Sequence, residues 1–406
     1  MASQEQQALY IKAVNDIAEV PSEAWDACAN PGGDIPDNPF LYHAFFSALE
    51  KSGSAVPARG WQPFHLTMET GEGELLGVVP MYLKGHSRGE YVFDGSWADA
   101  LERAGGKYYP KLQASVPFTP ATGRRLLARP GPNEEAIEAQ LAAGCVEVAK
   151  QLEVSSLHFT FLTEPQWSRL GELGLLKRMD RQFHWHNKGY ASFDEFLGDL
   201  SSKKRKNIRR ERRDAFANDI EIEWVTGSEL TEHHWDAFYQ FYTDTGSRKW
   251  GVPYLTRQFF SLVGESIPNN ILLILCRRAG QYIAGAINFI GSDALYGRNW
   301  GCVEDHPFLH FEACYYQAID FAIARGLKRV EAGAQGGHKL SRGYLPEATY
   351  SAHWIQDAGF RRAVDAYLKD ERNYVQEDID YIDTRAPFRK DMDLASVRPF
   401  KRRRLG

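Results

Sequence analysis

The sequence contains few cysteines, and they are scattered. Five occur among 406 residues, at positions 28, 145, 276, 302 and 314, and no two form a C-x-x-C pair. Neither a zinc ribbon nor a disulfide framework is therefore predicted. We expect Cys145, Cys276 and Cys314 to pack as small buried hydrophobic side chains, and a nucleophilic cysteine is the alternative.

Long apolar runs are also lacking. The longest, Ile271–Cys276, is far shorter than the roughly 20 residues of a membrane-spanning helix. The N-terminal residues show no basic segment followed by an apolar segment, so the sequence predicts no signal peptide. We therefore expect a soluble, cytoplasmic protein without a membrane span.

Charge of either sign is not in large excess. The chain has 48 Lys and Arg against 53 Asp and Glu, which gives a net charge of −5. Dedicated nucleic-acid-binding proteins are usually strongly basic, so DNA is not an expected partner, whereas a local basic patch is compatible with this balance. Hydrophobic residues at 43% and aromatic residues at 13% suffice for two packed cores, and the length favours two domains.

Several catalytic motifs are absent as well. The sequence contains no H-E-x-x-H, no P-loop and no G-x-S-x-G. Metalloprotease, nucleotide-hydrolase and α/β-hydrolase chemistry are therefore not supported. The order of apolar segments instead predicts two α+β units.

Each half of the chain shows the order helix, antiparallel hairpin, strand, helix, strand. In the first half these are predicted at residues 42–51, 61–84, 91–93, 134–152 and 157–162. In the second half a helix at 190–217, a strand at 220–225 and two further helices at 235–245 and 256–263 precede the remaining elements. Those are predicted at 271–290, 295–300, 310–325 and 327–332.

The most informative segment is Gly333-Ala-Gln-Gly-Gly-His-Lys339, which follows the last predicted strand and continues to Arg342 and Tyr344. Glycine at 333, 336 and 337 allows positive φ and close approach of the backbone to a ligand. Free N–H groups beside Lys339 and Arg342 would suit an anionic or carbonyl-bearing ligand. An ordinary glycine turn with solvated charges is the alternative.

Other runs of polar and aromatic residues accompany this loop. They are Tyr91–Asp99, Lys107–Lys111, Val116–Gly123, Tyr296–Gly301, Glu304–Glu312 and Tyr315–Gln317. Together with the glycine-rich loop, the Tyr-Tyr-Pro-Lys-Leu-Gln, Pro-Phe-Thr-Pro and Pro-Phe-Leu-His-Phe-Glu runs resemble the FemAB-like family of N-acyltransferases, a branch of the GNAT superfamily. The resemblance covers roughly residues 38 to 383. One departure is Gly337, where relatives are expected to carry an acidic residue.

The resemblance implies two tandem GNAT-like lobes, each a mixed, mostly antiparallel sheet flanked by helices. We expect an N-terminal lobe at residues 1–185 and a C-terminal lobe with the glycine-rich loop at 186–385. A basic tail is expected at 386–406. The implied reaction is attack of an amine on an activated acyl group, with acyl-CoA or aminoacyl-tRNA as co-substrate and no tightly bound cofactor or metal.

This chemistry requires alignment of amine and carbonyl, donors for the oxyanion and removal of the ammonium proton. His338 is the first candidate base, and Glu331 is the second; packing roles are the alternatives. Substrate binding is assigned to the loop and to nearby polar and aromatic residues. The set is Gly333, Gln335, Gly336, Gly337, Lys339, Arg342, Tyr344, Arg298, Trp300, Asp94, Trp97, Tyr108, Tyr109 and Lys111.

For the aromatic residues a core role is equally compatible with the sequence, and so is loop capping for Asp94. One marked basic run, Lys203–Arg213, is the candidate anion-binding helix, with Arg205, Arg209 and Arg210 facing phosphates of coenzyme A or tRNA. A solvated helix face is the alternative. The tail Lys401–Arg404 is expected to be a disordered terminus.

The leading hypothesis is an acyl-CoA-dependent N-acyltransferase acting on a small or amino-acid-like amine. An aminoacyl-tRNA-dependent Fem-type peptidyltransferase acting on a cell-wall precursor is the second. A non-catalytic ligand-binding relative is the third, because Gly337 replaces the expected acid. The sequence does not define the oligomeric state.

Overall fold

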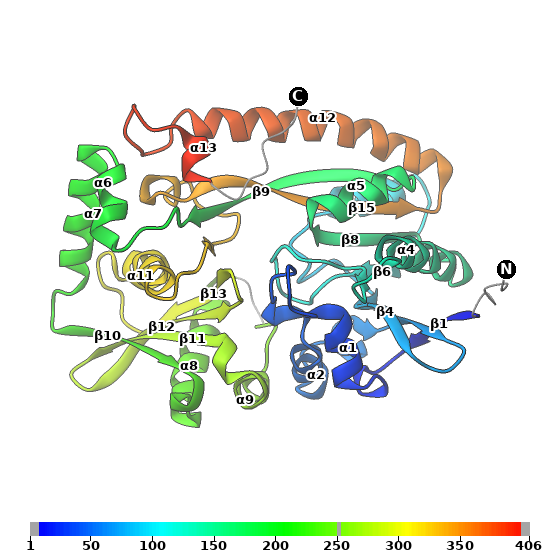
Figure 1. Ribbon diagram of the computed structural model, residues 1–406, viewed down its shortest axis with the longest axis horizontal. Coiled ribbons are helices and arrows are strands. Elements are labelled where there is room, and N and C mark those ends of the chain that lie inside the picture. The colour runs from blue at the N-terminus through cyan, green and yellow to red at the C-terminus, as the bar shows by residue number, and fades with distance from the viewer. Residues whose placement is uncertain (1–7, 250–252, 399–406) are drawn as a thin grey trace. The chain divides into compact units, whose positions relative to one another are not determined.

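A computed structural model describes residues 8–249 and 253–398, without the side chains of 245–249. Its contacts divide the chain into two compact units (Figure 1). The described part of unit 1 comprises residues 8–180, 254–259 and 349–374. Unit 2 comprises 181–249, 253, 260–348 and 375–398. The predicted tail Lys401–Arg404 lies outside the described residues.

Unit 1 contains two sheets, with strand orders β1-β3-β4-β7 and β2-β5-β6-β8-β15. Its strands are β1 (Leu9–Val14), β2 (Trp61–Pro63), β3 (His65–Thr70), β4 (Leu75–Val79), β5 (Met81–Lys84), β6 (Lys111–Ala114), β7 (Leu127–Ala128), β8 (Ser156–Leu162) and part of β15 (Leu345–Ile355). Its helices are α1 (Ser22–Ala29), α2 (His43–Lys51), α3 (Gly95–Arg103), α4 (Glu134–Gln151), α5 (Glu164–Glu172) and the first part of α12 (Ala358–Asp383).

The two faces of the second sheet in unit 1 differ sharply in polarity. On one face Leu112, Leu157 and Phe159 pack in an apolar core with α4 and α5. Because strand side chains alternate, the intervening residues share the other face. There the cross-strand partners Tyr82, Gln113, His158 and His353 form a row across β5, β6, β8 and β15, and all are buried.

Unit 2 is built on a sheet with the strand order β10-β11-β12-β13-β14-β9. Its strands are the second part of β9 (Leu176–His186), β10 (Ile220–Thr226), β11 (Ile271–Arg278), β12 (Gln281–Ile290), β13 (Ala294–Cys302), β14 (Arg329–Glu331) and the start of β15. Its helices are α6 (Phe193–Asp199), α7 (Ser202–Ala215), α8 (Glu232–Lys249), most of α9 (Arg257–Ser266), α10 (Leu309–Phe311), α11 (Gln317–Ala324), the end of α12 and α13 (Leu394–Val397).

Strands β10 to β13 are antiparallel, whereas β13 and β14 are parallel. Helix α8 lies on one side of β12 and β13, and α11 lies on the other (Figure 1). The apolar core of unit 2 lies on the α11 side and includes Leu272, Ala286 and Val330. Phe388 and Val397, beyond α12, also belong to this core.

Most long predicted elements exist, with local corrections. Residues 91–93 are not a strand, because this segment is a loop with Tyr91 at a φ of 60°. The predicted helix at 190–217 is two helices, α6 and α7, since Leu200 leaves the helical region with a ψ of 154°. Sequence patterns missed β9, β15 and the 26-residue α12. Among the described residues, no helix has both the length and the apolar character required to cross a bilayer.

Candidate functional site

The parallel strands β13 and β14 pair only over three residues and then separate. Their register joins Ala294 to Arg329 and Tyr296 to Glu331, and no pairing follows within the described strands. A shift in register between β12 and β13 falls at the same place, where Ile287 faces Asn299 and Asn288 faces Gly297. Such a bulge bends the strand and commonly marks a site. The strands therefore open at Gly297.

A cavity of about 110 Å³, the donor cavity below, lies at this opening. It is lined by Ala286, Ile287, Asn288, Gly297, Arg298, Asn299, Trp300, His310, Cys314, Tyr315 and Ala332. Arg298 and Trp300, both predicted from the sequence, are therefore at the same site. The indole ring of Trp300 lies 5.4 Å from the imidazole ring of His310, so β13 and α10 contact one another across the cavity wall.

A π-helical turn, Glu312–Tyr316, supplies two lining residues, Cys314 and Tyr315. Single π turns inside helices are rare and often occur at functional sites, because they alter which side chains face inward. Burial raises the pKa of the Cys314 thiol well above its usual range. Cys314 therefore stays protonated, which agrees with the expectation of a packed cysteine rather than a nucleophile.

The glycine-rich loop follows β14 directly. Gly333 and Gly336 have φ values of 74° and 99°, a region that favours glycine. A Cβ atom at Gly336 would lie 2.3 Å from the ring of His338, so only glycine lets this ring fold back over the loop. Gln335, Gly337 and His338 are exposed. The loop thus presents its backbone and one imidazole to solvent.

Lys339 and Arg342, the two predicted anion-binding cations, contact the protein itself. The ammonium of Lys339 donates to the carbonyl oxygens of Ala332 and Gly333, and burial lowers its pKa to about 8. Arg342 donates to Glu211 at 2.7 Å and to the His338 carbonyl at 2.8 Å. Both side chains are buried, as is that of Tyr344, whose hydroxyl donates to the Tyr315 carbonyl. These contacts hold the loop in place, and any direct role in binding stays a prediction.

Glu331, the second candidate base, is 4% exposed. Its Oε1 accepts from Arg329 Nε at 3.0 Å, and its Oε2 lies 3.8 Å from His184 Nε2. Its neighbour Val330 belongs to the apolar core, so Glu331 faces the other side of the sheet. Glu331 is therefore less well placed than His338 for a direct role at the donor cavity.

His338 is the predicted base that the structure places best. Its Nε2 lies 3.0 Å from the hydroxyl oxygen of Tyr315, which lines the donor cavity. Partial burial lowers the pKa of His338, and the nearby cations of Arg342 and Lys339 lower it further. The imidazole is therefore neutral at neutral pH, as a base requires.

The predicted anion-binding residues lie on α7. Arg209 pairs with Asp194 at 2.9 Å, and Arg205 donates to the Gly198 carbonyl. Arg210 is exposed, as are Lys203 and Lys206, and no described acidic side chain pairs with these three. Residues three and four apart share a helix face, so these three cations form one stripe. Seven residues of helix span about 10 Å.

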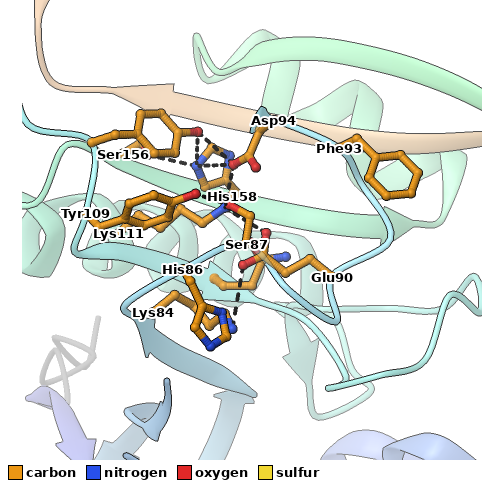
Figure 2. Close-up of polar contacts among 12 residues, drawn as sticks. Lys84, His86, Ser87, Glu90, Phe93, Asp94, Tyr109, Lys111, Ser156 and His158 are labelled. Atoms are coloured by element: carbon orange, nitrogen blue, oxygen red, sulfur yellow. Dashed lines mark hydrogen bonds and ion pairs between the residues drawn. The ribbon is translucent and has the colours of Figure 1, made fainter. Parts of the chain in front are cut away.

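The remaining predicted substrate residues, Asp94, Trp97, Tyr108, Tyr109 and Lys111, belong to unit 1. Figure 2 shows Asp94, Tyr109 and Lys111 among their polar neighbours. Lys111 is fully buried, and its ammonium donates to Ser87, Glu90 and Asp94. The Tyr108 hydroxyl donates to Asp94 at 2.7 Å. Each donor of Lys111 thus already has a partner within unit 1.

This charged cluster of unit 1 consists of Lys84, Glu90, Asp94 and Lys111. Burial lowers the pKa of Lys84 to about 7, and burial raises the pKa of Glu90 to about 7. For Asp94, burial opposes ionisation, but Lys111, His158 and a hydrogen bond from Ser87 together hold the pKa below the usual range. Lys84 lies 3.4 Å from the Trp61 ring centre, a cation–π contact. Sequence reasoning missed Lys84 and Glu90, because nothing local marks a lysine as buried.

Sequence reasoning also missed Asn288, His310, Cys314 and Tyr315 as cavity residues. His310 and Tyr315 lie in polar and aromatic runs that were recognised, whereas Asn288 lies in an apolar strand. A larger hollow of about 300 Å³ in unit 2 is lined by Gly227, Ser228, Leu230, Thr231, Glu232, Trp235, Ser261, Gly264, Glu265 and Pro268. It contains none of the predicted site residues.

Comparison with known proteins agrees with this architecture. The model of the FemAB-like family, described as peptidoglycan biosynthesis/recognition, matches residues 16–390. The chain belongs to this family. A comparison with curated proteins finds no match.

Two solved structures share the fold at low sequence identity. The crystal structure of FemX is 10% identical with a TM-score of 0.52, over 85% of this chain and 98% of that one. A C-terminal DUF2156 domain, of a protein described as a lysylphosphatidylglycerol synthetase from Agrobacterium fabrum, is 11% identical with a TM-score of 0.52, over 87% and 97%. The predicted α+β fold class, with mixed sheets flanked by helices, is confirmed. Membership of this family supports acyl or aminoacyl transfer as the class of reaction.

Proposed function

We propose that this protein transfers an acyl group from an acyl-CoA-type donor to the amine of a small or amino-acid-like acceptor. The observation that carries the proposal is the donor cavity at the opening of β13 and β14, with Tyr315 in its wall and His338 in contact with the Tyr315 hydroxyl. A thioester carbonyl placed there has unpaired strand backbone beside it, which can donate to an oxyanion. Family membership supports the class of reaction, and the donor and acceptor are proposals.

The reaction is assigned to the two side chains as follows. His338 takes a proton from the acceptor ammonium, directly or through one water, and the freed amine attacks the acyl carbon. The nitrogen of the tetrahedral intermediate then loses its second proton to water, the intermediate collapses, and the bond between the acyl carbon and the leaving sulfur breaks. The Tyr315 hydroxyl gives its proton to the leaving thiolate, and the proton held by His338 returns to Tyr315 across their hydrogen bond. The net products are an amide, a thiol and one released proton.

An aminoacyl-tRNA donor is the second candidate, and the cationic stripe of α7 favours it. Lys203, Lys206 and Arg210 are exposed along about 10 Å of helix, which suits successive phosphates. The leaving group is then a ribose hydroxyl, and the roles of His338 and Tyr315 stay the same. The predicted cytoplasmic location stays a prediction for either donor, as does the assignment of Asp94 and its neighbours to the acceptor.

The test is release of free thiol from a panel of acyl-CoA donors with mixed amine acceptors, run beside a panel of aminoacyl-tRNAs. Thiol release that needs an amine and resists ribonuclease supports the proposed donor. Transfer from aminoacyl-tRNA that ribonuclease abolishes selects the second candidate. If neither donor reacts, and calorimetry still detects binding of an acyl-CoA, the chain is a non-catalytic relative.

A further inference from the structure

Asn288 of β12 is a buried polar side chain in an apolar row. It is 1% exposed, and its amide nitrogen has no hydrogen-bond partner among the described residues. Its neighbours two and four positions earlier, Ala286 and Ala284, belong to the apolar core on the same face. A buried donor without a partner is costly, and a leucine of similar size would avoid that cost. Packing alone gives no reason for asparagine here.

The Asn288 amide lies beside a glycine of the neighbouring strand, with its oxygen toward that glycine. Its cross-strand partners are Leu272 on β11 and Gly297 on β13. Gly297 has no side chain, and a Cβ atom there would lie 3.3 Å from the Glu331 carbonyl oxygen and 3.5 Å from Asn288 Oδ1. Asn288 and Gly297 both line the donor cavity. The Asn288 side chain therefore adjoins the space in which the acyl group is placed.

We propose that Asn288 selects donors whose acyl group carries a hydrogen-bond acceptor, such as a hydroxyl, two or three bonds from the reacting carbonyl. This inference rests on the proposed function, because it places the acyl group in the donor cavity. The cavity volume of about 110 Å³ corresponds to about four waters at 30 Å³ each, which limits the acyl group to a short one. Short hydroxylated or otherwise polar acyl groups form the substrate class.

The reason for selectivity is the cost of leaving the amide unpaired. A plain alkyl acyl group fills the cavity without satisfying Asn288, whereas a hydroxylated one accepts its hydrogen bond. Sites built to bond a substrate hydroxyl reject the analogue that lacks it far better than apolar pockets reject a methylene. The same acyl chemistry occurs on coenzyme A and on tRNA, so both sources require testing.

The experiment compares donors that differ by one hydroxyl at the third carbon. One arm uses 3-hydroxypropionyl-CoA and propionyl-CoA, and the other uses seryl-tRNA and alanyl-tRNA. We expect wild type to prefer the hydroxylated donor at least tenfold in kcat/KM. In Asn288→Leu this preference is expected to fall below twofold. Equal use of both donors by the wild type overturns the inference and leaves the proposed function standing.

Two measurements decide the matter without turnover. Calorimetry compares binding of the unreactive thioethers S-(3-hydroxypropyl)-CoA and S-propyl-CoA. The inference is wrong if the wild type does not bind the first at least tenfold more tightly, or if Asn288→Leu shows the same preference as the wild type. This holds even if no donor reacts. Thermal unfolding compares wild type, Asn288→Leu and Asn288→Ala. We expect Asn288→Leu to melt at or above the wild-type temperature, because it removes an unpaired buried donor. If both variants melt lower or do not fold, Asn288 has a structural role and the inference is wrong.

Discussion

The Nε2 atom of His338 lies 3.0 Å from the hydroxyl oxygen of Tyr315. This contact joins the glycine-rich loop after β14 to the π-helical turn that lines the donor cavity. The two residues are 23 positions apart in the sequence, and each lies on a different element. The proposed proton transfer therefore requires the loop to keep its conformation, which Gly336 and the buried side chains of Lys339 and Arg342 stabilise.

Replacement of His338 by alanine is expected to lower kcat by about 10² to 10⁴, the usual contribution of a general base. Because the pKa of His338 is lowered by burial and by two cations, the neutral form persists below the ordinary value of 6.5. The wild-type rate should therefore fall only as pH drops below that value, and the acid limb should vanish in the variant. A pH–rate profile with less than a threefold change and an unaltered acid limb removes His338 from the mechanism.

Charge reversal on α7 tests the cationic stripe. Lys206→Glu combined with Arg210→Glu should raise KM for a polyanionic donor and flatten the dependence of binding on salt, because fewer counterions are released. Lys150→Glu on α4, also at an exposed position, is the matched control. If both proteins bind the donor alike at every salt concentration, the stripe is a solvated helix face.

Replacement of Lys84 by methionine is expected to stabilise unit 1 at pH 7 and below, because it removes an ammonium whose ionisation burial opposes, while Glu90 keeps its closer partner Lys111 at 2.7 Å. The folded pKa of about 7 lies below the ordinary 10.5, so between these values the unfolded chain binds more protons. The contribution of Lys84 to stability therefore rises with pH from about 7 to 10.5. Glu90 acts in the opposite sense below pH 7, outside this window.

Urea unfolding between pH 7 and 9.5 measures this effect. The wild type should gain stability over the window, and Lys84→Met should show a smaller slope. An unchanged slope together with a less stable variant would mean that Lys84 is charged and well paired in the folded state.

The ion pair between Arg212 and Glu312 should be essential to the π-helical turn. Arg212 donates to both carboxylate oxygens of Glu312, which is fully buried, and also to Asp320. Arg212→Ala leaves a buried carboxylate without its partner, so we expect a loss of about 3–5 kcal/mol. The double variant Arg212→Ala, Glu312→Leu should recover most of this loss. A single variant as stable as the wild type would contradict this account.

The long elements and several residues near the cavity could be predicted from the sequence. The contacts that their side chains make could not. Helix α4 and the hairpin of β11 and β12 follow from apolar periodicity, and the loop Gly333–Lys339 follows from its glycines. Periodicity gives no partner for a charged side chain, so the contacts of Lys339 and Lys111 within their own units could not be predicted. Binding of a ligand by these two lysines stays a prediction.

The separation of β13 from β14 could not be predicted from the sequence either. It depends on where two strands far apart in the chain stop pairing, and no local signal marks Arg298 as the extra residue of β13 opposite Ile287 and Asn288. Residues 349–374 belong to unit 1 because of long-range contacts. No change in composition marks the points where the chain passes from one unit to the other.

Acyl transfer is proposed to take place at the donor cavity, and filling that cavity tests this proposal most directly. Ala286 lines it and is 3% exposed, so Ala286→Leu places three additional carbons there. The measurement is the rate of amine-dependent transfer from the best donor, compared with Ser228→Leu in the larger hollow, with circular dichroism to confirm folding. We predict at least a hundredfold loss for Ala286→Leu and less than a twofold change for Ser228→Leu. A folded Ala286→Leu protein that retains the wild-type rate would contradict the account.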